Sequence, residues 1–309
     1  MTSPSSSRFL PLILVIGFGL LMGLIPVLVK LAAESAVSPS LFAIVQASGA
    51  GLVILALCRI LGHRLSLDRR SMRYYAIAGL SGIALPNELL FLSVPHLGAG
   101  LIAILYCFPP LITLCMALAI GMERLNLWRA GGILLGLAAS LAITLPKGNL
   151  NADPFWLAIA MSAPLSLAFG NIYRSRSWPP GAKPLPLAAG MLLAGALWLL
   201  PVLLLTGLTG ETGAPILLPT ERGILLLAFV VAITAIGYVM FLTLQQIAGA
   251  VYMSQVGYVI TATGLAIGVG FLGEQYGPWI WVAVALVFAA VALATIPGKA
   301  PPVRHSDPS

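Results

Sequence analysis

Long apolar stretches alternate with short polar ones along the chain. Each apolar stretch runs for about 20 residues, the length that a helix needs to cross the hydrocarbon core of a bilayer. Prolines, glycines and charged residues fall between the stretches and mark the ends of helices. The pattern predicts ten membrane helices, at residues 9–31, 41–61, 74–94, 99–122, 126–146, 154–173, 187–205, 222–244, 248–272 and 278–297.

The second half of the chain repeats the first. FLSVPHLGAG at residues 91–100 is echoed by FLTLQQIAGA at 241–250, and Glu123 and Glu274 both close the helix that follows. Weak internal repeats of this kind are typical of secondary transporters. Because five helices per unit is an odd number, the second unit enters the membrane from the opposite side and the repeat is inverted. The predicted units are residues 1–147 and 148–299, followed by a polar tail at 300–309.

Composition supports an all-α integral membrane protein. The chain is 60% hydrophobic and 8% charged, whereas soluble domains carry roughly 25% charged residues. If both ends lie on one side of ten helices, thirteen of the sixteen lysines and arginines fall on that side. The positive-inside rule therefore predicts a multi-pass protein of the cell (inner) membrane with cytoplasmic N- and C-termini. The net charge of +7 is thus topological and implies no nucleic-acid partner.

Several kinds of chemistry lack their motifs in this sequence. The three cysteines lie in apolar runs without a CxxC pattern or a histidine partner, and no phosphate-cradling Gly-Lys-Ser/Thr loop occurs. We therefore expect no metal site, no cofactor and no ATP hydrolysis.

The order of these features resembles EamA-type ten-helix members of the drug/metabolite transporter superfamily. The resemblance covers Phe9 to Pro297 and rests on the two five-helix halves, on FLSVPHLGAGLIAIL at 91–105, and on the small residue and Glu that close two helices. Gly273-Glu274 matches the family's Gly-Glu pair, whereas Glu123 follows its glycine with one inserted residue. The resemblance implies a central cavity between the halves, alternating access, and export of amino acids or other small metabolites, often in exchange for a proton or another metabolite.

Glu88 is the sharpest candidate for a functional residue. It lies within the apolar run 74–94, about 21 Å along the helix from Tyr74, in the predicted outer half of the membrane. A carboxylate at that depth is costly unless it is paired, hydrated or protonated. It is read either as a proton or cationic-substrate site, or as a neutral carboxyl that bonds a helix or faces the outer mouth. Pro86 is expected to kink the helix, and Asn87 either bonds the freed carbonyl or lines the cavity.

Uncharged polar residues supply further candidates in three helices. Gln255 and Tyr258 are three residues apart and share a helix face. Their amide and phenol groups suit a zwitterionic substrate, and interhelical hydrogen bonding is the alternative. Gln46 is read in the same two ways, as a pore group or a packing hydrogen bond. Tyr106 precedes a double proline that suggests a broken helix, so it either lines the cavity or packs.

Three basic candidates lie near the predicted membrane surfaces. His96 is read as a proton relay with Glu88 or as an interfacial histidine. Lys30 lies about 30 Å along its helix from Leu10, where it either snorkels to headgroups or contacts an anion at the outer mouth. Arg174 ends its helix on the inside. It is the counterpart of Lys30 under inversion if the helix at 154–173 echoes that at 9–31, and anchoring on the inside is the first explanation. Asn171 and Tyr173 are weaker candidates near the same mouth.

The sequence favours a secondary transporter, and the family resemblance implies that it exports small metabolites such as amino acids. The implied partners are a small-molecule substrate, the lipid bilayer and a proton, and the protein is a monomer or a homodimer. The alternative is a membrane-embedded enzyme acting on lipid or prenyl substrates, which would need a cluster of His, Asp or Glu at the membrane surface. The only such grouping, His63 with Asp68, lies among arginines and reads as a solvated loop. We therefore predict that the chain is not an enzyme.

Overall fold

A computed structural model describes residues 6–35, 37–90, 92–93, 96, 105–106, 108–123, 126–144, 153–209, 220–272, 282, 285–286, 289–290 and 293. Within these ranges the chain forms helices and turns, without strands. The helices are α1 (Ser6–Gly23), α2 (Ile25–Ala33), α3 (Pro39–Ile60), α4 (Arg69–Gly79), the π-helical turn η1 (Leu80–Ala84), α6 (Pro109–Ala119), α7 (Leu127–Thr144), α8 (Pro154–Arg176), α9 (Pro184–Thr209), α10 (Glu221–Ser254) and α11 (Val256–Leu272).

Side-chain caps explain where several helices begin. Ser38 accepts a hydrogen bond from the Leu41 amide at the start of α3, and Asp153 accepts one from Phe155 at the start of α8. Both helices have proline in the first turn, where its missing N–H is not needed. The predicted cap at Asn126 is confirmed, since its side chain accepts from the Trp128 amide. Polar residues at these positions therefore fix the helix starts locally.

The predicted helices at 41–61, 126–146, 154–173 and 187–205 correspond to α3, α7, α8 and α9. In the described part of the chain, five helical segments are long and apolar enough to cross a membrane. The predicted helix at 278–297 falls almost wholly outside the described residues. The fold is thus a multi-pass helical bundle, and the ten-helix inverted repeat remains a prediction.

Some boundaries differ from those predicted. The helix expected at 9–31 is divided by a turn at Leu24 into α1 and α2. The break expected between residues 244 and 248 is a kink inside α10 at Gly249, whose φ of 79° and ψ of −180° are not helical. Only glycine adopts this backbone conformation readily. A turn at Gln255 then separates α10 from α11.

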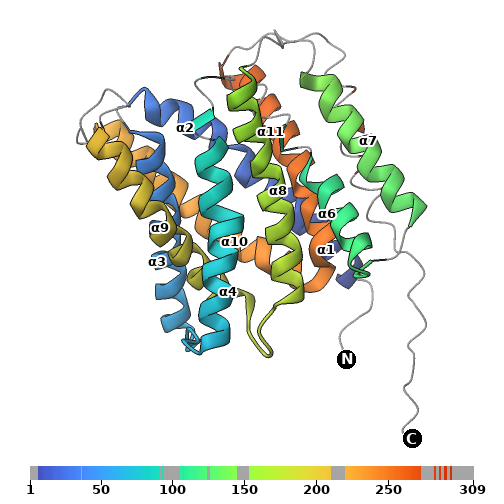
Figure 1. The fold of residues 1–309 in the computed structure, drawn as a ribbon, viewed down its shortest axis with the longest axis horizontal. Coiled ribbons are helices and arrows are strands. Elements are labelled where there is room, and N and C mark those ends of the chain that lie inside the picture. The colour runs from blue at the N-terminus through green and yellow to red at the C-terminus, as the bar shows by residue number, and fades with distance from the viewer. Residues whose placement is uncertain are drawn as a thin grey trace, which may run out of the picture.

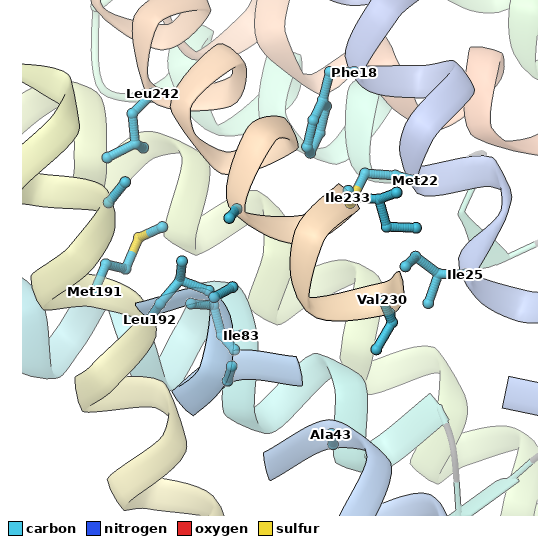
Figure 2. Packing of buried hydrophobic residues seen from close by; sticks show 14 of the residues in the cluster. Phe18, Met22, Ile25, Ala43, Ile83, Met191, Leu192, Val230, Ile233 and Leu242 are labelled. Atoms are coloured by element: carbon cyan, nitrogen blue, oxygen red, sulfur yellow. The ribbon is translucent and has the colours of Figure 1, made fainter. Parts of the chain in front are cut away.

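Helix α10 is the central element of the bundle. It packs against α1, α2, α3, α6, α8 and α9, and Figure 1 shows α7 at the edge. The core between these helices is apolar, with Val230 and Ile233 of α10 close to Met22 and Ile25 (Figure 2). Elsewhere glycines allow close backbone approach: a Cβ on Gly79 would lie 2.6 Å from the Gly195 nitrogen, where α4 meets α9.

Two faces of the bundle can be told apart by their turns. The loops at 61–68 and 177–183 jointly line a surface cavity of about 580 Å³ that includes His63, Arg64, Arg70 and Lys183. We call this the basic face. At the other end, Thr220 at the start of α10 donates a hydrogen bond to the Ser35 carbonyl, and we call this the opposite face. The loops at 61–68 and 177–183 therefore lie on the same side of the bundle. The predicted topology requires this, because they follow the second and the sixth of the ten predicted helices.

Candidate functional site

Glu88 lies near the opposite face, against the start of α3. The helix that follows η1 continues over residues 85–90 and carries it. Glu88 is 8% exposed, and its Oε1 accepts a 2.8 Å hydrogen bond from the Ser40 hydroxyl. Its Oε2 is buried without a hydrogen-bond partner among the described residues. The Glu88 carboxyl is thus a buried acid with one oxygen still available to a proton or a ligand.

The distortion expected at Pro86 takes the form of the π-helical turn η1. The Leu85 amide bonds back to Leu80, five residues earlier, in the wider π spacing. In this spacing Pro86, which has no N–H, leaves the Ser81 carbonyl without its backbone donor. The Ser166 hydroxyl of α8 donates to the Ser81 carbonyl at 2.9 Å. Ser166, rather than the half-buried Asn87, therefore bonds the Ser81 carbonyl. Such π-turns often occur at functional sites.

Gln46 joins α3 to α10 in the interior. Its Nε2 donates to the Thr234 hydroxyl at 3.1 Å. Its Oε1 is buried and has no hydrogen-bond partner among the described residues. Gln46 thus makes the packing hydrogen bond that the sequence suggested and keeps one acceptor free.

Gln255 and Tyr258 lie around the turn between α10 and α11, and both are fully buried. The Tyr258 hydroxyl donates to the Ile133 carbonyl of α7 at 2.7 Å, and its ring packs where Gly136 has no side chain. Tyr106, which is half-buried, places its carbonyl 2.4 Å from where a Cβ on Gly257 would stand. Neither amide atom of Gln255 has a hydrogen-bond partner among the described residues. The two residues therefore differ: Tyr258 joins helices, and Gln255 is left unpaired.

The remaining basic candidates lie apart from these groups. His96 is exposed and stacks on Trp156, with ring centroids 3.8 Å apart and planes 5° apart. This contact fits the interfacial interpretation, whereas the Glu88 carboxyl accepts a hydrogen bond from Ser40. Lys30 belongs to α2, but its side chain lies outside the described part of the structure.

The expectation for Arg174 was wrong. It was predicted to anchor α8 at the membrane surface, but its side chain is 1% exposed. The Cα–Cβ bond of a helical residue tilts towards the helix N-terminus, so the side chain runs back into the bundle. There it reaches Gly170, one turn earlier, and Gly82 in η1. These two glycines leave the space that the guanidinium fills.

The Arg174 side chain is held by neutral groups. Its Nε donates to Oε1 of Gln245 at 2.9 Å, and its Nη2 donates to Oδ1 of Asn171. The Asn171 amide in turn donates to Thr113, and the Gln245 amide donates to the Asn171 carbonyl and to the Ser175 hydroxyl. This network links α6, α8 and α10 at the level of η1.

One ring of an aromatic cluster lies against the same guanidinium. The Phe241 ring lies 4.9 Å from the Arg174 Cζ, a cation–π distance. Phe18 of α1 packs on both Phe241 and Tyr238, with ring centroids 5.0 and 6.3 Å away. Tyr238 also packs on Phe241, with ring centroids 5.5 Å apart, and Tyr74 stacks on Tyr173, the residue before Arg174. We call Arg174, Phe241, Phe18, Tyr238 and Tyr74 the arginine cage.

Several buried polar atoms have no hydrogen-bond partner among the described residues. An unpaired buried polar group costs about 1–3 kcal/mol, more if it is charged. Most native proteins avoid such groups unless they have a role. Among the described residues they are Gln46 Oε1, Tyr74 Oη, Glu88 Oε2, Arg174 Nη1, Gln255 Nε2 and Gln255 Oε1.

The sequence analysis named Gln46, Glu88 and Gln255 as candidates. It did not single out Tyr74, and it did not predict the buried position of the Arg174 side chain. A signal for Arg174 was present, because Asn171 and Arg174 are three residues apart and so share a helix face with Gly170 nearby. Polar residues that share one face of a membrane helix usually face the interior of the bundle.

Comparisons with known proteins agree with this architecture. A model of the EamA-like transporter family matches residues 9–145. YedA of Escherichia coli K12, named an uncharacterized inner membrane transporter, is 28% identical over 266 residues, which are 84% of this chain and 82% of YedA. The YedA proteins of E. coli O6:H1 and O157:H7 match to the same extent.

A crystal structure matches the fold with a TM-score of 0.71 at 20% identity, over 95% of this chain and 99% of that chain. At this identity the likeness concerns the fold alone. Residues 9–145 thus match the model of the EamA-like transporter family, and the chain is similar over most of its length to YedA, which is named an inner membrane transporter.

Proposed function

We propose that this protein is a secondary transporter of the inner membrane that exports a small metabolite, such as an amino acid, by alternating access. The observation that carries the proposal is the match of residues 9–145 to the model of the EamA-like transporter family. The similarity to YedA over most of both chains supports it. The two five-helix units, 1–147 and 148–299, with both termini in the cytoplasm, belong to the same proposal.

The interior of the bundle supports this function in chemical terms. Buried polar groups that lack partners line several helices that meet at α10. We assign Gln46, Gln255, Tyr258, Tyr106 and Asn87 to the substrate path, because uncharged hydrogen-bonding groups suit a small polar solute. Lys30 and His96 are assigned to the mouth at the opposite face. Groups of this kind inside a membrane bundle mark substrate and ion pathways.

The helices also carry the breaks that a moving transporter needs. Helix α10 kinks at Gly249, η1 widens the helix before Pro86, and a turn at Leu24 divides α1 from α2. Non-helical backbone of this kind is tolerated at membrane depth where it is buried in protein or lines a polar path. Transporter sites are often built at such discontinuities.

Proton coupling through Glu88 is the finer part of the proposal. A buried carboxyl with one free oxygen can bind and release a proton as the bundle opens and closes. The enzyme alternative needs a cluster of His, Asp, Glu or Cys, and the described residues hold no group of three or more that could bind a metal.

Purified protein in liposomes tests the function directly. Labelled amino acids and nucleosides are offered one at a time, with and without a pH gradient. We expect saturable exchange of at least one solute, above that of empty liposomes, and a response of its rate to the gradient. If no solute in the panel exchanges faster than in empty liposomes, the transport proposal is wrong.

A further inference from the structure

Arg174 is a buried cation whose contacts among the described residues are all with neutral groups. They are two amide oxygens and the face of Phe241. In the described part of the protein, no carboxylate contacts it, and its Nη1 has no hydrogen-bond acceptor. Taking a charge out of water costs several kcal/mol even after relaxation. A bundle that keeps such a charge at 1% exposure is suited to receive an anion.

A second unpaired group comes from the neighbouring helix α4. Tyr74 is fully buried, its hydroxyl has no hydrogen-bond partner among the described residues, and its ring stacks on that of Tyr173, the residue before Arg174. The Tyr74 ring is held by Tyr173 and Trp178, with ring centroids 6.0 and 6.2 Å away. The hydroxyl is therefore held by packing alone. The two groups offer one unpaired N–H and one unpaired O–H donor where α4 meets α8.

We propose that the arginine cage binds the carboxylate of a small organic monoanion, with Arg174 Nη1 and the Tyr74 hydroxyl as the donors. This inference rests on the proposed transport function and names the chemical class of its substrate. Two donors match the two oxygens of a carboxylate, and one positive charge balances one negative charge. A phosphate would bring more acceptors than these donors satisfy and a second uncompensated charge.

The rest of the cage suits the organic part of such a molecule. Phe241 lies against the guanidinium, Phe18 and Tyr238 pack on Phe241, and Tyr238 and Phe241 are only half-buried. Rings of this kind bury the apolar body of a ligand while the charged end is held by the arginine.

The described conformation is closed around Nη1. A Cβ on Gly82 would lie only 2.1 Å from this nitrogen, so the guanidinium rests directly on the backbone of η1. Separation of η1 from α8 would free Nη1 to face a ligand. Binding of the carboxylate therefore belongs to a second conformation, as alternating access requires.

Ligand binding tests the proposal without any transport step. Purified protein in nanodiscs of phosphatidylcholine is titrated calorimetrically with a panel of monocarboxylates that includes acetate, phenylacetate and phenylalanine, each paired with its neutral amide. We expect at least one carboxylate to bind about tenfold to a hundredfold more tightly than its amide. Arg174→Gln should abolish that preference, Arg174→Lys should restore part of it, and Tyr74→Phe should weaken carboxylate binding with less effect on the amide.

The matched control is Arg176→Gln, which removes an exposed arginine from the same helix end and should bind like the wild type. The proposal is overturned if no carboxylate binds, if amides bind equally well, or if Arg174→Gln binds as the wild type does. Competition by phosphatidylglycerol added to the nanodiscs would also overturn it, because a lipid phosphate would then be the anion. Binding without transport in liposomes rejects the transport function alone, and transport of neutral solutes without carboxylate binding rejects the anion site alone.

Discussion

Ser40 and Glu88, 48 residues apart in the chain, are joined by a 2.8 Å hydrogen bond from the Ser40 hydroxyl to Glu88 Oε1. The bond ties the start of α3 to the helix that follows η1. It satisfies one carboxyl oxygen and leaves the other, Oε2, without a partner in the described part of the bundle. This arrangement is specific enough to test by changing the carboxyl alone.

Glu88→Gln should remove the pH dependence of transport. The glutamine amide oxygen still accepts from Ser40, so the helix contact is kept while the titrating group is lost. We expect transport rates in liposomes at pH 6 and pH 8 to become equal. The control is Glu34→Gln, which neutralises an exposed glutamate at the same face and should keep the wild-type profile. An unchanged pH profile in Glu88→Gln would reject the coupling role.

Asp68, which lies on the basic face, leads to a prediction about the stability of the protein at low pH. The hydroxyls of Ser66 and Ser71, with the backbone amides of Ser71 and Arg70, hold the pKa of Asp68 below its usual range. A lowered pKa means that the folded state prefers the ionised carboxylate. Its contribution to stability is therefore complete above the unfolded pKa of about 3.9 and is lost as the pH falls below that value.

Asp68→Asn should weaken this acid sensitivity, because the asparagine oxygen still caps α4 but does not titrate. We expect the melting temperature of the wild type, followed by circular dichroism, to fall more steeply than that of the variant between pH 5 and pH 3. Above pH 5 the two profiles should run parallel. Parallel profiles over the whole range would show that the Asp68 charge does not stabilise the fold.

Local chemistry made part of this fold predictable. Asn126 was recognised as a helix cap because a cap depends on the amides of the next few residues. Pro86 was expected to disturb its helix because the missing N–H is a property of proline itself. The kind of disturbance was not predictable, since the π-turn places Ser81 against Ser166, 85 residues away.

Arg174 shows the limit of the same reasoning. An arginine at a helix end usually extends to the headgroups, and the local signal, Asn171 on the same helix face, does not by itself say that the side chain turns inward. Its inward direction depends on Gly82 and Gln245, which come from distant segments and supply the space and one of the acceptors. Side chains whose environment is built from several helices are therefore the ones that sequence patterns misplace.

Gly249→Ala should stiffen or distort the kink in α10. The φ of 79° and ψ of −180° at this position lie in a region that is essentially restricted to glycine, and a side chain there costs on the order of 1–3 kcal/mol. We expect a lower melting temperature and slower transport. Gly131→Ala is the control, because a Cβ on Gly131 meets no atom within 4 Å. If Gly249→Ala melts and transports like the wild type, the kink is not required.

Gln255→Leu separates a role in packing from a role in substrate contact. Neither amide atom of Gln255 has a hydrogen-bond partner among the described residues, and leucine has a similar volume. Removing an unsatisfied buried amide should leave the free energy of unfolding unchanged or raise it, by up to about 1–3 kcal/mol. If the amide contacts the substrate, transport should fall about tenfold, the loss expected for a hydrogen bond worth about 1.4 kcal/mol.

The control for Gln255→Leu is Gln246→Leu, at an exposed position on the same helix pair; it should transport at the wild-type rate because its amide already faces the surroundings of the bundle. Stability and transport are measured on the same preparations, by thermal unfolding and by solute exchange in liposomes. A Gln255→Leu protein that is stable and inactive places the amide in the substrate path. One that is stable and fully active shows that the buried amide makes no contact that transport needs.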